Sequence, residues 1–261
     1  MKVLGVIPAR MESSRFFGKP LENILGIPMI AHCYERALMS DCDELVISTP
    51  NTVIRDWCFE RNIPAIITSN SHERASERAE ETLRMLEADQ GETYSHTILI
   101  QGDEPQVLPS EINSVIKKLG EGAEIVNQVI EINKAEATSE DVVKVILNKL
   151  NEIIYFSRSV IPNNAEKFYR QLGIIGFTSF MLKQYVSLET TLCEQLESID
   201  MMRFLENDIP ITGLLSKEKI IGVDRHDDIL HVEKKLANDL LFKKYQNKYC
   251  LLYTSDAADD L

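Results

Sequence analysis

The sequence predicts an α/β fold with a doubly wound, mostly parallel sheet and a smaller lobe within the second half. Short apolar runs rich in Val, Ile and Leu recur through the first half, which is typical of strands buried on both faces of a parallel sheet. Segments with helical spacing separate these runs, so strands and helices are expected to alternate with right-handed crossovers. With 261 residues, of which 44% are apolar, the chain can bury a sizeable core.

The first half contains the elements that build the predicted sheet. Strands are expected at the runs VLGVIPA (3–9), ELVIST (44–49), AIIT (65–68) and TILIQG (97–102). Helices are expected over residues 29–39, 53–61 and 73–88. Ligands of such sheets bind beyond the carboxyl ends of the strands, so the site is expected at the loops PARMESSR, TPN, SNSHERASER and QGDEP.

The second half is less regular. Strands are expected over residues 123–132, 142–148, 153–161 and 172–179, and helices over 191–207 and about 227–248. Residues 211–215 and 219–224 are expected to form a hairpin or paired strands. We expect residues 1–249 to form one domain with a smaller lobe around 150–205, and residues 250–261 to be a non-native or disordered tail.

The charge of the chain limits the classes of partner. The sequence has 28 Lys and Arg against 41 Asp and Glu, a formal net charge of −13, which argues against general affinity for nucleic acid or anionic membranes. The first apolar run is too short for a signal peptide, and no run approaches the ~20 residues of a membrane span. The five cysteines are scattered and never form a CxxC pair. A reduced, cytoplasmic protein without membrane insertion is therefore expected.

A dense cationic loop nevertheless follows the first predicted strand. Arg10, Arg15 and Lys19 supply three cations, and Ser13, Ser14 and Gly18 permit tight turns and supply donors. Backbone N–H groups and fixed cations at the end of a strand suit the phosphates of a nucleotide. The loop is not a Walker motif, and a solvated basic loop that pairs with the abundant carboxylates would show the same pattern.

Asp103 in QGDEP and Asp224 in GVD each follow an apolar run. Mg²⁺ takes oxygen ligands and commonly binds through one or two carboxylates plus substrate phosphates, so these two aspartates are candidate metal ligands. They could meet at one metal only if their strands are neighbours in the sheet. Taken singly, each could instead be a helix cap or a turn residue.

Several motifs together resemble one enzyme family. IPARMESSRFFGKPL, QGDEP, YFSR, LGI, ESIDMMRFLE and GVD occur in that order between residue 2 and about residue 236. The chain thereby resembles the cytidylyltransferases that activate 3-deoxy-manno-octulosonate (Kdo). The resemblance implies a homodimeric α/β nucleotidyltransferase that joins CMP from CTP to an ulosonic acid, releases pyrophosphate and uses Mg²⁺.

The resemblance also implies roles for particular residues. For the nucleotide it implies Pro8 and Ala9 near the cytosine, with Arg10, Ser13, Ser14, Arg15, Lys19, Ser76 and Arg78 around the remainder. It implies catalytic roles for Arg15, Lys19, Asp103 and Asp224, the last two as Mg²⁺ ligands. For the sugar it implies Gln101, Arg158, Gln171, Glu194 and Glu197.

The chain departs from the family pattern at several of these motifs. Phe17 replaces a proline of the first loop, and HERASER (72–78) has Ala75 and Ser76 in place of a Gly-Thr pair. Arg74 in this segment adds a cation near the expected nucleotide pocket, or pairs on a helix surface with Glu77 or Glu81.

In the sugar pocket, Gln171 and Ile175 stand where the family has histidine and tyrosine. These exchanges leave open a nonulosonic acid as the substrate, and a catalytically weak nucleotide-binding homologue remains a further alternative.

Overall fold

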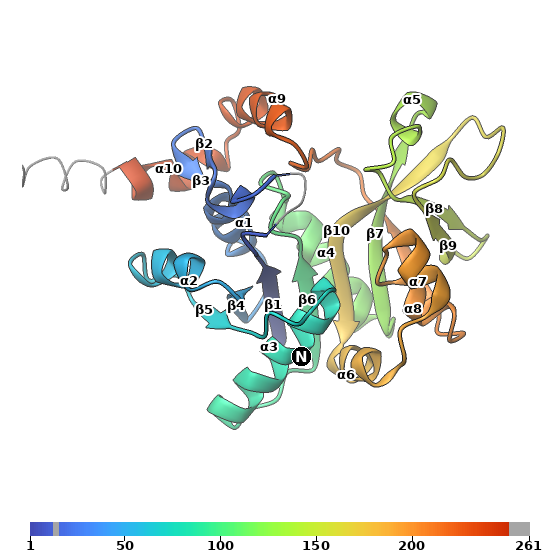
Figure 1. Cartoon of the computed structure of the whole chain (residues 1–261), viewed down its shortest axis with the longest axis horizontal. Helices are drawn as coiled ribbons and strands as arrows, with labels where there is room; N and C mark the ends of the chain where they lie inside the picture. Colours follow the sequence, from blue (N-terminus) through green and yellow to red (C-terminus); the bar gives the residue numbers. More distant parts are fainter. Residues whose placement is uncertain (13–15, 251–261) are drawn as a thin grey trace, which may run out of the picture.

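The computed structural model describes residues 1–12 and 16–250 and is built around one nine-stranded sheet (Figure 1). The strands of the first half are β1 (Val3–Pro8), β4 (Glu44–Thr49), β5 (Ala65–Ile67) and β6 (His96–Ile100). They run parallel in the order β5-β4-β1-β6, as predicted. A two-stranded hairpin of β2 (Asn23–Ile24) and β3 (Ile27–Pro28) lies outside this sheet.

Helices cover both faces of the sheet, which confirms the doubly wound arrangement. On one face pack α1 (Met29–Ala37), α2 (Thr52–Phe59) and α4 (Pro109–Gly120), and on the other α3 (Ala75–Gln90) and α6 (Ser179–Ser187). Strand β1 shows why: Leu4 and Val6 join the core under α3, whereas Val3 and Ile7 join the core under α1. Alternate side chains of a strand point to opposite faces, so each face acquires an apolar layer.

The second half extends the sheet and makes it mixed. Strand β10 (Phe168–Thr178) pairs antiparallel with β6 and with β7 (Ile125–Ile132), and β11 (Ile211–Leu215) runs parallel to β7. Strand β9 (Glu152–Ser157) pairs with β11 and with β8 (Lys144–Leu147), and β8 also pairs with β10. The strands β7, β11, β9, β8 and β10 therefore close into a ring, accompanied by the short helix α5 (Lys134–Ala137).

Three predictions for the second half are wrong in detail. The single helix over 191–207 is two short helices, α7 (Leu192–Glu197) and α8 (Met202–Leu205), because Ser198 adopts a left-handed conformation with φ 56°. The expected strand over 219–224 does not form, since β7 and β9 already occupy both sides of β11. The terminal helix is divided into α9 (His226–Leu236) and α10 (Phe242–Cys250) at a turn in which Asp239 accepts the Leu241 N–H.

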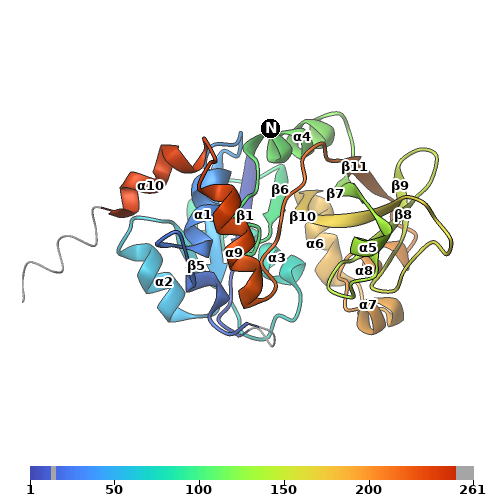
Figure 2. The ribbon, with the colours of Figure 1, turned by 90° about the horizontal axis from the view of Figure 1, so that it is seen from above.

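The C-terminal helices pack beside α1 and the β2–β3 hairpin (Figure 2). Of the non-native or disordered tail predicted over 250–261, residue 250 instead ends α10, and residues 251–261 lie outside the described residues. Within the described ranges, we find no helix that is long and apolar enough to cross a membrane.

A buried histidine joins α1 to α10. His32 is fully buried, with its Nε2 2.9 Å from the Ile24 carbonyl and its Nδ1 2.8 Å from the Tyr245 hydroxyl. The carbonyl can only accept, so the neutral ring carries its proton on Nε2 and Tyr245 donates to Nδ1. Burial lowers the pKa of His32 to about 4.

His32 should make folding stability depend on pH. The depressed pKa means that the unfolded chain binds more protons, so this contribution is complete above about pH 6.5 and declines as the pH falls towards 4. At pH 5 the loss should reach about 2 kcal/mol. Urea denaturation at pH 7 and pH 5 should show a smaller difference in unfolding free energy for His32→Asn than for the unchanged protein. An equal difference in both proteins would contradict this assignment.

Candidate active site

Two adjoining cavities open beyond the carboxyl ends of β1 and β6. The first, of about 230 Å³, is lined by the loops after β1 and β6 and by the residues that lead into α3. The second, of about 510 Å³, lies between the loop after β6, strand β10 and the segment before α9. Gln101 and Asp103 line both cavities, so the two spaces share a wall.

The first cavity contains most of the described residues predicted to bind the nucleotide. Pro8, Ala9, Arg10, Lys19 and Arg78 line it. The predicted residues Ser13, Ser14 and Arg15 lie outside the described part of the chain.

Two residues of the HERASER segment differ in their relation to this cavity. Arg78 is held by its bonds to Thr68 Oγ1 (2.6 Å) and the Ser69 carbonyl (3.1 Å), and burial lowers its pKa. The prediction that Ser76 faces the nucleotide is not met, because Ser76 is fully buried and donates to Asp200 at 2.7 Å. Ser76 lies in the first turn of α3 on the side that faces the protein interior, so its side chain does not face the cavity.

His72 also lines the first cavity. Its Nε2 lies 2.7 Å from Glu81 Oε2, so it is a hydrogen-bonded loop histidine.

Lys19 connects the cationic loop after β1 to the two segments that carry the candidate metal ligands Asp103 and Asp224. Gly18 adopts a left-handed conformation with φ 77°, and the short 3₁₀ helix η1 (Lys19–Leu21) starts directly after it. Lys19 Nζ lies 2.8 Å from Asp103 Oδ2 and donates to the Val223 carbonyl at 2.9 Å. The ammonium group is thereby fixed at the wall that both cavities share.

Asp103 and Asp224 converge by a route that the sequence did not predict. The segment around Asp224 is not a strand, but the Val223 N–H donates to the Asp103 carbonyl at 2.8 Å. The Asp224 N–H donates to Asp228 Oδ2 at 2.9 Å, which fixes it at the start of α9. Both aspartates line the second cavity.

This donor set fits a magnesium ion. Mg²⁺ is usually held by one or two carboxylates together with substrate phosphates and water, and two aspartates beside a cationic loop meet that requirement. Among the residues described, no group of three or more His, Cys, Asp or Glu side chains could hold a metal alone. A phosphate ligand would therefore have to complete the coordination.

Glu104 adds a further carboxyl group beside Asp103. It is 9% exposed, its Oε1 accepts the Gly173 N–H at 3.0 Å, and its buried Oε2 has no hydrogen-bond partner among the described residues. Burial and the neighbouring Asp103 carboxylate raise the pKa of Glu104 to about 7. Glu104 thus ties the loop after β6 to the middle of β10.

The second cavity contains some of the residues predicted to bind the sugar. Gln101, Arg158 and Gln171 line it. Glu194 and Glu197 do not: Glu194 is fully buried against Arg203, and Glu197 accepts from the Arg158 N–H (2.8 Å) and from Ser157 Oγ (2.7 Å). Their sugar-binding roles were implied by the family resemblance, whereas in the structure both lie in α7 with their carboxylates engaged by Arg203 and by the Ser157–Arg158 segment, so they support the cavity wall.

Arg170 and Asp200 also line this cavity and were not predicted. Arg170 donates to the Ile220 carbonyl. Its position directly before the predicted pocket residue Gln171 was the sequence signal that could have identified it. Asp200 belongs to the motif ESIDMMRFLE, but its exposure to the cavity depends on the turn at Ser198, which the motif did not reveal.

Comparison with known proteins identifies the family. A family model described as cytidylyltransferase matches residues 4–220. The chain belongs to this family. It is 34% identical over 239 residues to a 3-deoxy-manno-octulosonate cytidylyltransferase of Fusobacterium nucleatum, covering 89% of this chain and 96% of the relative. A mitochondrial enzyme of the same name from Arabidopsis thaliana is also 34% identical, over 89% of this chain and 82% of its own length.

A solved structure agrees with this assignment. The structure of a CMP:2-keto-3-deoxy-manno-octonic acid synthetase complexed with CTP matches with a TM-score of 0.83 and 31% identity, covering 92% of this chain and all of that one. The match to this structure accounts for the fold of nearly the whole chain.

Proposed function

We propose that this cytidylyltransferase transfers CMP from CTP to the anomeric hydroxyl of a Kdo-like ulosonic acid and releases pyrophosphate. The observation that carries the proposal is the wall between the two cavities, where Lys19 binds Asp103 and the Val223 carbonyl directly before Asp224. The first cavity offers cations for a triphosphate, and the second offers space and polar groups for an acidic sugar. The names of the relatives and of the matching structure support the same substrates.

In this reaction the chain mainly positions charges. Arg10 and Lys19 hold the triphosphate, and Pro8 and Ala9 bring backbone near the base. The anomeric hydroxyl loses its proton to solvent, and its oxygen forms a bond to the α-phosphorus while the bond to the pyrophosphate oxygen breaks in line, so the charge that develops on pyrophosphate falls near Lys19. Asp103 and Asp224 would hold Mg²⁺, which polarises the α-phosphate and lowers the pKa of the attacking hydroxyl.

The sugar is placed by the second cavity. Arg158 is the proposed partner of the ulosonate carboxylate, and Glu197 holds its backbone N–H while the Glu197 carbonyl accepts Arg158 Nε at 2.9 Å. Gln171 and Ile175 line the same cavity, at the two positions where the pattern of the Kdo cytidylyltransferases has histidine and tyrosine. This difference favours, as a second candidate, a related acidic sugar such as a nonulosonic acid. A homodimer and a cytoplasmic location complete the proposal.

Pyrophosphate release tests the reaction directly. The protein should be incubated with CTP and Mg²⁺ and with Kdo, its 8-amino analogue, sialic acid or no sugar, and each arm should be repeated with UTP and with a chelator. Release with one ulosonic acid, dependent on CTP and on the metal, is the expected result. Silence with every sugar from folded protein that still binds CTP would reject the proposed sugar class, and loss of CTP binding as well would reject the nucleotide site.

Lys19→Ala should impair the use of CTP more than the use of the sugar. Lys19 reaches the shared wall from the nucleotide side and offers a point charge to the phosphates. We expect the KM for CTP to rise by roughly tenfold, with a smaller change for the sugar. Initial rates at varied CTP and varied sugar would measure both constants. Unchanged CTP dependence would remove Lys19 from the phosphate site.

Gln171→His should change the preference among ulosonic acids. Gln171 Nε2 donates to Asn127 Oδ1 at 2.6 Å while its side chain lines the second cavity, so an imidazole there would offer a different set of donors. The ratio of kcat/KM values for two ulosonic acids is the measurement. The same ranking in both proteins would place sugar selection elsewhere in the cavity.

A further inference from the structure

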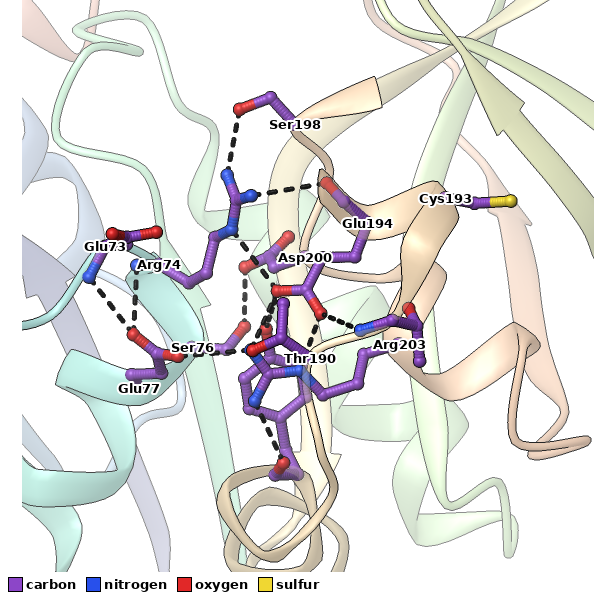
Figure 3. A network of polar contacts seen from close by, with 12 residues as sticks. Glu73, Arg74, Ser76, Glu77, Thr190, Cys193, Glu194, Ser198, Asp200 and Arg203 are labelled. Atoms are coloured by element: carbon purple, nitrogen blue, oxygen red, sulfur yellow. Dashed lines mark hydrogen bonds and ion pairs between the residues drawn. The ribbon is translucent and has the colours of Figure 1, made fainter. Parts of the chain in front are cut away.

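Arg74 connects the start of α3, beside the first cavity, to α7 and to the turn after α7 (Figure 3). The sequence had suggested either a cation in the nucleotide pocket or an ion pair along one helix. It precedes the first residue of α3 and lines the first cavity, but its guanidinium points towards α7. Nε donates to Glu194 Oε1 at 3.3 Å, one terminal nitrogen to Ser198 Oγ at 2.9 Å, and the other to the Glu194 carbonyl at 3.2 Å. Its side chain is 15% exposed.

These bonds end on the turn that separates α7 from α8. Ser198 stands at the left-handed position of that turn, and Ser198, Ile199 and Asp200 line the second cavity. A left-handed conformation is unfavourable for a residue other than glycine, so a contact from outside the turn helps to hold it. Arg74 supplies such a contact from a segment 124 residues away in sequence.

The neighbouring bond from Ser76 acts on the same turn. Ser76 Oγ donates to Asp200 Oδ2 at 2.7 Å, so two residues that flank the start of α3 hold both ends of the Ser198–Asp200 turn. Burial raises the pKa of Asp200, whereas the Ser76 hydroxyl and the positive charge of Arg74 act in the opposite direction. Arg74 and Ser76 therefore fix the position of the Ser198–Asp200 turn and favour the negatively charged form of Asp200.

We propose that Arg74 is a positioning residue that holds the Ser198–Asp200 wall of the sugar cavity and so sets the apparent affinity for the sugar, although it lines the nucleotide cavity. This inference rests on the proposed function, because the proposed function assigns the second cavity to the sugar. Each of the three nitrogens of the guanidinium is committed to α7 or to the turn that follows it, which leaves little of the fork for a phosphate. The nucleotide should consequently be affected less than the sugar.

Arg74→Ala tests the role by separating two Michaelis constants. Loss of the contact should raise the sugar KM by roughly 10- to 100-fold, since a small displacement of a positioning group has effects of that size, while the CTP KM stays within about twofold. Arg84→Ala removes an exposed arginine from the same helix and should change neither constant. In Arg74→Lys the charge remains but the fork is lost, so its sugar KM should stay closer to that of the alanine variant.

A double-mutant cycle and hydrogen exchange complete the test. Arg74→Ala and Ser198→Ala should be non-additive in sugar kcat/KM because they remove one contact from opposite sides. Amide exchange over residues 194–200 should be faster in Arg74→Ala than in Arg84→Ala. This second readout needs no substrate, so it separates failure of the inference from failure of the proposed reaction. A raised CTP KM with an unchanged sugar KM, or unchanged exchange in this turn, would overturn the proposal.

Discussion

Asp103→Asn and Asp224→Asn should each lower turnover by roughly two orders of magnitude or more while the fold is kept. Each change replaces a carboxylate oxygen with an amide nitrogen and removes one negative charge from the proposed Mg²⁺ site. Both side chains line the second cavity and both are partly exposed, so neither substitution disturbs the core. In Asp103→Asn the Lys19 ammonium also loses its carboxylate partner at 2.8 Å.

The measurement is kcat for pyrophosphate release at saturating CTP and sugar, over a range of Mg²⁺ concentrations. Circular dichroism and the urea midpoint establish that the variants are folded. Asp56→Asn is the matched control, because this exposed aspartate of α2 pairs only with its neighbour Arg55 in the described contacts and should turn over normally. Near-normal turnover in either test variant would remove that aspartate from the metal site.

Arg203→Met should lower the free energy of unfolding by about 3–5 kcal/mol. Arg203 holds Glu194 by two contacts of 2.7 Å, and the exposed fractions of the two side chains are 4% and 0%. The guanidinium also lies over the Tyr185 ring and donates to Glu77. Its removal leaves a fully buried carboxylate with Arg74 as the remaining cation (Figure 3).

Urea denaturation measures this loss, and two further variants show its cause. Glu194→Gln added to Arg203→Met should recover part of the stability, because the buried charge is then absent. Lys183→Met removes the exposed member of a pair with the partly exposed Glu87 and should cost less than about 1 kcal/mol. Equal losses in Arg203→Met and Lys183→Met would show that burial of the Arg203 pair adds nothing to its strength.

The sequence predicted the first half well because its signals are local. Each of the runs that form β1, β4, β5 and β6 is a short apolar segment between turns, and such runs have few alternative structures. In the second half, the apolar pattern of 191–207 was read as one helix, but the break at Ser198 is held from outside by Arg74. Residues 219–224 have the composition of a strand but form none, because β7 and β9 already pair with both sides of β11.

The site shows the same division. The motifs identified Lys19, Asp103 and Arg78 because each belongs to a short, continuous motif at the edge of the sheet where the first cavity opens. Glu194 was assigned to the sugar, yet its role depends on Arg203 and on a guanidinium 120 residues away. A pairing of that kind leaves no trace in local spacing, so a single sequence could not reveal it.

The ring of β7, β11, β9, β8 and β10 has a consequence for how the protein behaves at high concentration. Exposed sheet edges carry unpaired backbone groups on which another chain can build, and they are therefore sites of aggregation. In the ring, β8 has a neighbouring strand on each side. At the opposite end of the sheet stands β5, which has three residues. Among the described residues, the strand at this edge of the nine-stranded sheet is thus a very short template, which should favour solubility during folding and at crowded concentrations.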